Sequence, residues 1–292
     1  MMDDEIFDKY RQAGAFAASV IRKGSAEIRP GAPYIEVIEF IEDLASSEES
    51  GLAFPLNVSL NEDAAHDTAS TGDERVFAQG DLVKLDLGVH FDGYIADTAI
   101  TIDLGNNGLL VDASREALSR AIEKVRPGAT VGELGFAIQT EIESRGYRPI
   151  SNLTGHGLAR FVVHKPPNIP NIAIQGGAVL EEGMVFAIEP FATTGSGHVS
   201  EKKRVEIFQQ ISHKPVRLAS ARKVLEAVRD RQGMPFAKRW LPDTRPDIAL
   251  TTLIRSGMVH AYPVLSDIPG SLVSQHEHTV IVTEDHCIVT TA

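Results

Sequence analysis

The sequence predicts a mixed α+β fold. Amphipathic helical stretches and alternating strand patterns occur in one chain, and the strands are separated by turn signals typical of antiparallel hairpins. No repeat of solenoid length and no low-complexity tract is visible. Helix pairs mixed with hairpins favour α+β over a doubly wound parallel sheet, in which strands and helices alternate regularly.

Two helices are expected first, from about Asp4 to Arg22 and from Pro33 to Leu44, because apolar residues recur there at helical spacing. The second helix has proline in its first turn, where proline is favoured. Strands are expected at Leu82 to Val89 and Tyr94 to Ile102, where apolar and polar residues alternate. Asp92-Gly93 lies between them and is a common hairpin signal.

The rest of the chain continues this mixture of elements. Helices are expected at Asp112 to Val125, stopped by Pro127-Gly128, and from the N-cap residue Thr130 to Gly146. Further strands are expected around Met184 to Ile188 and His276 to Val289. The stretches rich in glycine and proline are interpreted as turns rather than interdomain linkers.

Composition limits the class of protein. A chain of 292 residues that is 43% hydrophobic can bury a full core, as one large domain or as a domain with an appendage. The single cysteine, Cys287, has no partner for an internal disulfide, so we expect a reducing compartment, the cytoplasm. An acidic start and the lack of an apolar run near 18 residues predict no secretory signal and no membrane span. The net charge of -12 disfavours nucleic-acid binding over the whole surface.

Two aspartates on the expected hairpin are the first candidates for a metal site. The flanking leucines share one strand face, so Asp86 lies on the other. If the loop consists of Phe91 and Asp92, counting back sets Asp86 directly opposite Asp97, with Cβ atoms about 4.5 to 5.5 Å apart. Such carboxylates repel each other unless a proton or a cation lies between them. The alternative is a pair of solvent-facing residues on an edge hairpin.

Three further segments contain residue types that bind metals. His156 lies between two glycines, Glu189 precedes a proline, and Glu277 lies in an expected strand. Each is weak evidence alone, because a histidine between glycines is commonly a turn residue. The ordered set of Asp86, Asp97, His156, Glu189 and Glu277 is more informative, since four carboxylates and one imidazole suit a pair of Mn, Fe, Co or Zn ions.

A series of short motifs accompanies these residues. In chain order they are Gly51-Leu52-Ala53-Phe54-Pro55, Ala65-His66, Lys84-Leu85-Asp86 with Asp97, Gly155-His156-Gly157 with His164, Ile188-Glu189-Pro190-Phe191, Arg217-Leu218-Ala219-Ser220-Ala221-Arg222, Pro235-Phe236, Arg239-Trp240-Leu241, Tyr262-Pro263 and Gln275-His276-Glu277-His278-Thr279. With them the sequence resembles the pita-bread metallohydrolases, and within these the type II methionine aminopeptidases, over nearly its whole length. Leu56 to Ser59 differ in detail from the family pattern, although the spacing is intact.

The resemblance implies a pita-bread (creatinase/aminopeptidase) fold, in which a curved antiparallel sheet is flanked by helix pairs. It implies removal of N-terminal methionine from nascent chains with a small second residue, by a water activated at two divalent metal ions (Co, Mn, Fe or Zn). The implied ligands are Asp86, Asp97, His156, Glu189 and Glu277, with Asp97 and Glu277 bridging both ions.

The resemblance also assigns residues around the metals. Glu189 is expected to accept the proton of the water. His66 and His164 are expected to contact the substrate, and one or the other of them to donate a hydrogen bond to the developing negative charge. Phe54 and Tyr262 are expected near the methionine side chain. The other histidines are read as core or surface residues: His90, His198, His213, His260, His276, His278 and His286.

The segment from Ser196 to Val259 has more lysine and arginine than acidic residues, and it resembles the helical insertion of type II enzymes. The expected domains are therefore a catalytic domain, 1–195 and 260–292, and a helical insertion, 196–259. Two explanations of the basic residues are open: a solvated helical face pairing with Glu226 and Asp230, or a surface that meets ribosomal RNA. The basic residues considered are Lys202, Lys203, Arg204, Lys214, Arg217, Arg222, Lys223, Arg229 and Arg231.

Two rival functions are open at this point. A prolidase or Xaa-Pro aminopeptidase of the same fold usually carries a sizeable domain ahead of the catalytic one, whereas the first expected ligand here is Asp86. A non-catalytic relative that binds peptide or RNA loses ligands, whereas this chain keeps all five. The expected partners are nascent polypeptide N-termini. A monomer is expected, because the short N-terminal segment resembles that of archaeal members.

Overall fold

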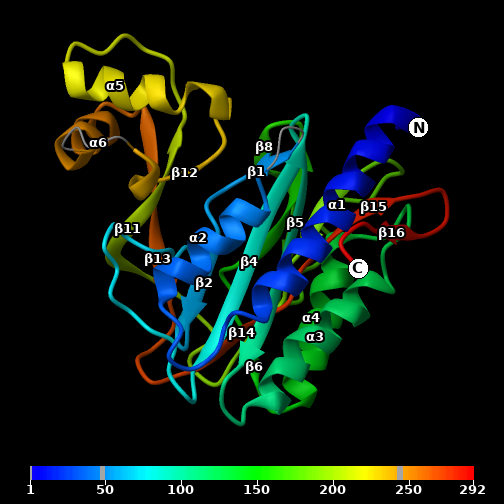
Figure 1. Cartoon of the computed structure of the whole chain (residues 1–292). Helices are drawn as coiled ribbons and strands as arrows, with labels where there is room; N and C mark the ends of the chain where they lie inside the picture. Colours follow the sequence, from blue (N-terminus) through cyan, green and yellow to red (C-terminus); the bar gives the residue numbers. More distant parts are fainter. Residues whose placement is uncertain (1, 47–49, 242–245) are drawn as a thin grey trace.

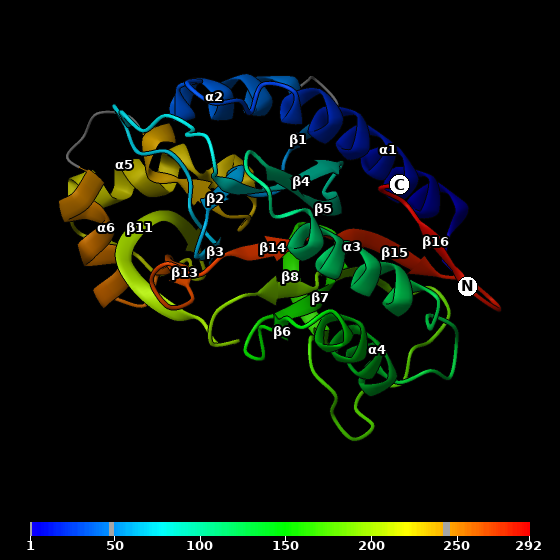
Figure 2. The same cartoon turned by 90° about the horizontal axis from the view of Figure 1, so that it is seen from below.

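The computed structural model describes residues 2–46, 50–241 and 246–292. Residues 242–245, inside the expected insertion, therefore lie outside the described residues. The first two expected helices form as α1 (Asp4–Ser25) and α2 (Tyr34–Leu44). Asp3 caps α1 by accepting a hydrogen bond of 2.9 Å from the backbone N–H of Glu5. Their apolar faces pack on the sheet that contains the central hairpin (Figures 1 and 2).

The central hairpin consists of β4 (Leu82–Phe91) and β5 (Tyr94–Asp103). Its loop is Asp92 and Gly93, whose φ angles of 49° and 84° lie in the left-handed region. A two-residue loop with positive φ at both positions is the turn that matches the twist of paired strands, and Asp-Gly is a preferred sequence for it. The turn chemistry therefore decides which two residues form the loop.

The expected register of this hairpin is wrong. Asp97 pairs with Gly88, and Asp86 pairs with Ala99, so the two aspartates do not face each other directly. Placing the loop one residue later, at Asp92-Gly93, shifts the pairing by two residues. Because the side-chain period of a strand is two, both aspartates still lie on the same face, as diagonal neighbours.

The strands pair antiparallel throughout the described residues. Around β4 and β5 lie β1 (Ser50–Leu52) and β2 (Asn57–Leu60), both paired with β4. The other strands form three sheets: β14 (Val273–Gln275), β10 (Phe191–Thr193) and β6 (Arg148–Pro149); β12 (Phe236–Ala237), β11 (Ser200–Gln210), β13 (Val259–Ser266) and β3 (Asp63–Ala65); and β16 (Cys287–Val289), β15 (His278–Val282), β9 (Val185–Ile188), β7 (Thr154–Ala159) and β8 (Val162–Pro170).

One isolated bridge connects the central hairpin to the C-terminal strands. Glu277 lies between β14 and β15, and its backbone N–H donates to the carbonyl of Ala99 on β5 at 2.9 Å. The side chains of β5 reinforce the junction, because Thr98 and Thr101 donate to the carbonyls of Glu277 and Gln275. The bridge therefore fixes the backbone of Glu277 against the strand that carries Asp97.

A second helix pair, α3 (Gly108–Ile122) and α4 (Val131–Ser144), packs on the other side of the strands (Figure 2). Thr130 caps α4 as expected and forms a capping box with Glu133. Helix pairs on antiparallel sheets confirm the predicted α+β class. No helix in residues 2–46, 50–241 or 246–292 is long and apolar enough to cross a bilayer.

The expected insertion, 196–259, is not purely helical. It contains α5 (Ala219–Ala227), α6 (Pro246–Arg255) and two short 3₁₀ helices, η1 (Arg229–Arg231) and η2 (Lys238–Trp240), but it also contains β11 and β12. The helices share a small core with Phe208 and Phe236 on these strands. They lie at one end of the molecule in Figure 1. β11 begins with a run of charged residues, so its sequence does not show the alternation of apolar and polar residues that predicts a strand. The boundaries of a separate subdomain stay a prediction.

Candidate metal centre

All nine residues expected to form the site line one cavity of about 260 Å³. Strand alternation directs Asp86 on β4, Asp97 on β5 and His156 on β7 into this cavity. Two further acids enter it from strand ends: Glu189 directly follows β9, and Glu277 lies between β14 and β15. The remaining four residues, expected to contact the substrate, are Phe54, His66, His164 and Tyr262.

The ligand atoms of three residues lie close enough to share one ion. Atoms of Asp97, His156 and Glu277 lie within 4.8 Å of one another. His156 Nε2 is 3.7 Å from Asp97 Oδ2 and 3.6 Å from Glu189 Oε1. The imidazole therefore points its Nε2 at two carboxylates. A cation between these groups could bind the nitrogen and both carboxylates.

Burial makes this group of acids costly to charge. Burial raises the pKa of Asp86 to about 7, although a hydrogen bond from Gln275 opposes the rise. Burial and the neighbouring carboxylates also raise the pKa of Asp97, Glu189 and Glu277 well above their ordinary values. Four acids in one cavity thus need protons or cations to balance their charge.

Burial has the opposite effect on the imidazole. It lowers the pKa of His156 to about 3, with a further contribution from His164. His156 is therefore neutral at every pH at which the carboxylates titrate. A neutral imidazole is the form that binds metals, so this residue needs to lose no proton on metal binding.

Several polar atoms in this cavity have no partner, which tests whether a metal fits. Asp86 Oδ1, Asp97 Oδ1 and Glu277 Oε1 are buried and accept no hydrogen bond. Buried polar atoms normally have a partner, and each exception calls for an explanation. Oxygen and imidazole ligands suit divalent ions such as Mn, Fe, Co and Zn, and the residues therefore fit a metal.

The glycines beside His156 belong to a strand and not to a turn. A Cβ atom on Gly155 would lie 2.3 Å from the Ala187 carbonyl oxygen, and one on Gly157 would lie 2.5 Å from that of Pro166. β7 can approach β9 and β8 this closely only because both positions lack a side chain. The glycines thus allow His156 to enter the cavity from a tightly packed strand.

Gln275 was missed by the sequence reasoning as a site residue. Its Nε2 donates to Asp86 Oδ2 at 3.3 Å and to Glu277 Oε2 at 3.2 Å, so one amide orients two carboxylates. Gln275 could have been predicted from the sequence, because residues two apart in a strand share a face and Gln275 is two residues before the expected ligand Glu277. His276 lies between them and points the other way, where its Nδ1 is 2.8 Å from Ser114 Oγ.

The four other residues bring rings into the same cavity. A Cβ on Gly88 would lie 2.2 Å from the Phe54 ring, so the ring lies directly over the backbone of β4. The ring centroid of Tyr262 is 5.2 Å from that of His66 and 6.2 Å from that of His164. Two imidazoles and two aromatic rings therefore line the cavity together with the carboxylates, and the His164 ring centroid is 4.3 Å from that of the proposed ligand His156.

Burial keeps the imidazoles of His66 and His164 neutral. It lowers the pKa of His66 and of His164 to about 4. His66 Nδ1 is 3.3 Å from the carbonyl oxygen of Pro263. None of the seven histidines read as core or surface residues lines the cavity, although the His260 ring is 4.7 Å from that of Tyr262.

Comparison with known proteins also indicates a metal-dependent peptidase. The model of metallopeptidase family M24 matches residues 8–284. A methionine aminopeptidase of Archaeoglobus fulgidus is 48% identical, and the alignment covers 99% of this chain and 100% of that relative.

Solved structures resemble the chain as well. A methionine aminopeptidase from Thermotoga maritima has a TM-score of 0.74 at 26% identity, over 100% of this chain and 98% of that one. A prolidase from Pyrococcus furiosus has a TM-score of 0.65 at 21% identity, and the chain spans 65% of its length. The likeness to the prolidase concerns the fold alone.

Proposed function

The chain belongs to metallopeptidase family M24 and removes N-terminal methionine, and we propose that it does so with two divalent metal ions held by five residues of one cavity. The proposed ligands are Asp86, Asp97, His156, Glu189 and Glu277. The observation that carries the proposal is the set of buried carboxylate oxygens without partners, gathered around a neutral imidazole.

The metal ions would supply an activated water, whose pKa falls from 15.7 toward about 7, and a positive charge that polarises the substrate carbonyl. The protein supplies the proton acceptor. Glu189 would accept the proton of the water, and its Oε1 lies 3.6 Å from Nε2 of the neighbouring proposed ligand His156. Glu189 would then pass this proton to the leaving amine.

The two histidines His66 and His164 take different roles. The carbonyl oxygen of Pro263 can only accept, so the neutral His66 ring carries its proton on Nδ1 and donates it there. His66 Nε2 is then an acceptor and binds a substrate N–H. His164 is also neutral, so one of its ring nitrogens carries a proton. It donates this N–H to the substrate carbonyl oxygen, where negative charge develops.

Selectivity follows from the shape of the cavity. Phe54, Tyr262 and Ile207 provide apolar surface for an unbranched methionine side chain. Substrates with a large second residue are expected to lose kcat/KM, because displacing the scissile bond by about 1 Å costs around a hundredfold. Small residues such as Gly, Ala and Ser are expected to be accepted.

The first test compares two peptides with metal-stripped protein. We expect release of methionine from Met-Ala-Ser when Mn, Co, Fe or Zn is restored, and no release of alanine from Ala-Pro under the same conditions. Cleavage before proline would instead support a prolidase-like activity. Lack of turnover with every metal would support a non-catalytic binding protein.

We propose in addition that exposed basic residues of the block 196–259 contact ribosomal RNA. Within the described residues, the ion pairs of this block are made by Lys202, Arg204, Lys238 and Arg239. The exposed residues Lys203, Lys214, Arg217, Arg222, Lys223 and Arg229 are not among them, and so do not pair with Glu226 or Asp230 there. Unpaired cations on α5 and its flanking loops suit phosphate contacts.

The salt dependence of ribosome binding tests this contact. Reversing Arg222, Lys223 and Arg229 to glutamate is expected to weaken co-sedimentation with ribosomes and to reduce its dependence on salt, because each lost phosphate contact lowers the log–log slope by about 0.7 to 0.9. Unchanged co-sedimentation over the same salt series would refute the contact. Methionine release from a free peptide serves as the control for folding.

A further inference from the structure

The three residues that follow His66 are held by three arginines from separate parts of the chain. Asp67, Thr68 and Ala69 are all buried, and we call residues 67–69 the clamped segment. Arg75 approaches it from the same loop, Arg204 from β11 and Arg239 from η2. Arg204 and Arg239 belong to the block 196–259, so this block contacts the residues that directly follow His66, which itself lines the cavity.

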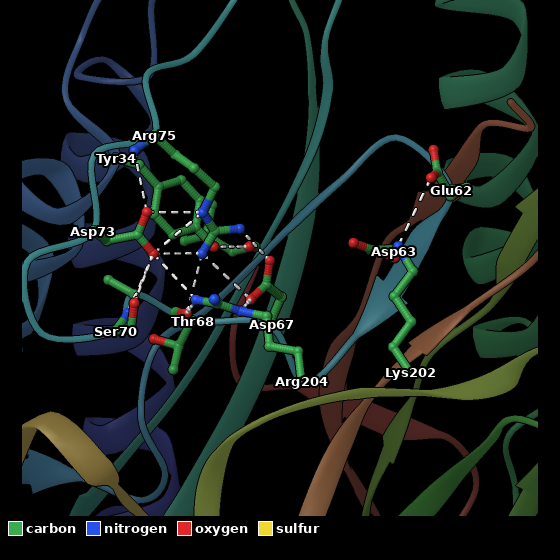
Figure 3. A network of polar contacts seen from close by, with 12 residues as sticks. Tyr34, Glu62, Asp63, Asp67, Thr68, Ser70, Asp73, Arg75, Lys202 and Arg204 are labelled. Atoms are coloured by element: carbon green, nitrogen blue, oxygen red, sulfur yellow. Dashed lines mark hydrogen bonds and ion pairs between the residues drawn. The ribbon is translucent and has the colours of Figure 1, made fainter. Parts of the chain in front are cut away.

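Arg204 binds the clamped segment through both side chain and backbone. Its Nε donates to Asp67 Oδ1 at 2.9 Å, and its Nη2 donates to the Thr68 carbonyl oxygen at 2.9 Å and to Asp73 Oδ2 at 3.1 Å (Figure 3). Arg75 donates to the same two carboxylates, at 2.5 Å to Asp67 and 2.8 Å to Asp73. Two planar guanidinium groups and two buried carboxylates thus form one network with fixed directions.

Arg239 holds the other end of the clamped segment. Its Nη1 donates to Thr68 Oγ1 at 3.0 Å and to the Ala69 carbonyl oxygen at 3.1 Å. Its Nη2 donates to Glu42 on α2, a carboxylate that also accepts from Trp240 Nε1 at 3.0 Å. Its side chain is only 5% exposed. The guanidinium therefore ties the segment to both α2 and the block 196–259.

His66 needs such support because of its backbone conformation. Its φ of 66° lies in the left-handed region, which is uncommon and unfavourable for a residue other than glycine. Such a conformation persists only where neighbouring contacts fix it. On one side Ala65 pairs with Leu265 of β13, and on the other the Asp67 carbonyl accepts from the N–H of Val58 at 2.8 Å.

We propose that Arg204 and Arg239 are positioning residues, which fix the clamped segment and thereby hold the His66 ring in its direction toward the substrate. The proposal rests on the role proposed above for His66. It gives the block 196–259 a part in catalysis, since β11 supplies Arg204 and also pairs with β13, whose Pro263 carbonyl accepts the hydrogen bond from His66 Nδ1.

A double-mutant cycle tests the proposal, using kcat/KM for Met-Ala-Ser with the metal-loaded full chain. Arg204→Gln is the first variant, because Arg204 is 34% exposed and Arg75 still neutralises Asp67 and Asp73 when it is lost. We expect a loss of about tenfold, less than the hundredfold that a displacement of about 1 Å produces. In the His66→Ala background the same substitution is expected to cause less than a twofold further loss.

Three matched variants accompany the cycle. Arg204→Lys keeps the charge without the fork of donors and should recover part of the loss. Arg231→Gln removes another inward-facing arginine of the block, one that donates to the Leu52 and Ala53 carbonyls instead. Its effect should be the same with and without His66. Arg255→Gln changes an exposed residue of α6 and should leave kcat/KM unchanged.

A second measurement does not depend on activity. In protein with ¹³C-labelled histidine, the signal that disappears in His66→Gln belongs to His66. We expect it to shift in Arg204→Gln and in Arg239→Lys, while the signal of the exposed His286 stays in place. An unmoved His66 signal would overturn the proposal even if one variant is too unstable to assay.

The outcomes of the cycle separate the two proposals. If His66→Ala is impaired but Arg204→Gln lowers kcat/KM equally in both backgrounds, the positioning role is refuted and the role of His66 stands. If His66→Ala cleaves Met-Ala-Ser at the normal rate, the role of His66 fails and the positioning role fails with it. Thermal midpoints of all variants are recorded in parallel, so that loss of folded protein is not counted as loss of rate.

Discussion

Glu277→Gln is expected to lower metal-dependent methionine release by at least about a hundredfold, since even residues that only support a metal ligand contribute about 10- to 100-fold. Glu277 is 2% exposed, its Oε1 has no partner, and its backbone is fixed to Ala99. A glutamine has the same shape but lacks the charge and one of the two acceptor oxygens. The substitution therefore removes charge from the site without leaving a cavity.

The measurement combines peptide turnover with metal stoichiometry. Glu277→Gln should bind fewer equivalents of Mn or Co in calorimetry and release methionine slowly at every metal concentration. The matched control is Glu284→Gln, because Glu284 is an exposed glutamate in the loop between β15 and β16. Normal turnover and normal stoichiometry in Glu277→Gln would exclude this residue as a ligand.

Metal affinity is expected to rise steeply with pH between about 6 and 8, by about tenfold per pH unit for each proton that the metal displaces. Burial raises the pKa of Asp86 to about 7, and burial together with the neighbouring carboxylates raises the pKa of Glu277 well above its ordinary value, so the metal-free site holds protons at neutral pH. His156 contributes none, since burial lowers its pKa to about 3. Calorimetry in buffers of different ionisation enthalpy would count the released protons.

The stability of the metal-free protein should change in the opposite direction. A carboxyl whose pKa is raised in the folded state stabilises the fold fully below its unfolded pKa of about 4, and this contribution is lost as the pH rises through the folded value. The metal-free protein is therefore expected to lose stability from about pH 4 to beyond pH 7. The gap between the thermal midpoints with and without metal should widen over that range, and a constant gap would contradict the prediction.

The positions of helices and strands could be predicted well because they depend on local patterns. Thr130 caps α4, and β4 and β5 form the expected hairpin. The register was harder, because the pattern of alternating residues is the same for a loop at Phe91-Asp92 or at Asp92-Gly93. The choice depends on the φ angles that a two-residue turn requires, and these favour Asp-Gly. Strand period alone cannot provide that choice.

The residues that line the candidate site could be predicted better than the residues that support them. The five proposed ligands and the four residues expected to contact the substrate line one cavity. Residue type and order pointed to the five ligands, whereas the four substrate residues came from the resemblance to the pita-bread metallohydrolases. The supporting residues were not predictable in this way. Gln275 could have been inferred from the strand period. The inward direction of Arg204 could not, because the residues before it, Lys202 and Lys203, are also basic and yet are exposed.

The bridge between Ala99 and Glu277 has a consequence for how the chain acquires its shape. It joins strands from opposite halves of the sequence, so the loop between them must close before either strand is fixed. Loop closure of this length lowers entropy before any contact compensates for it, which makes such pairings form late and slowly. Since Asp97 and Glu277 come together only at this step, a nascent chain still lacking its last strands has no complete metal site. The enzyme would acquire its activity at the end of folding, together with its metal.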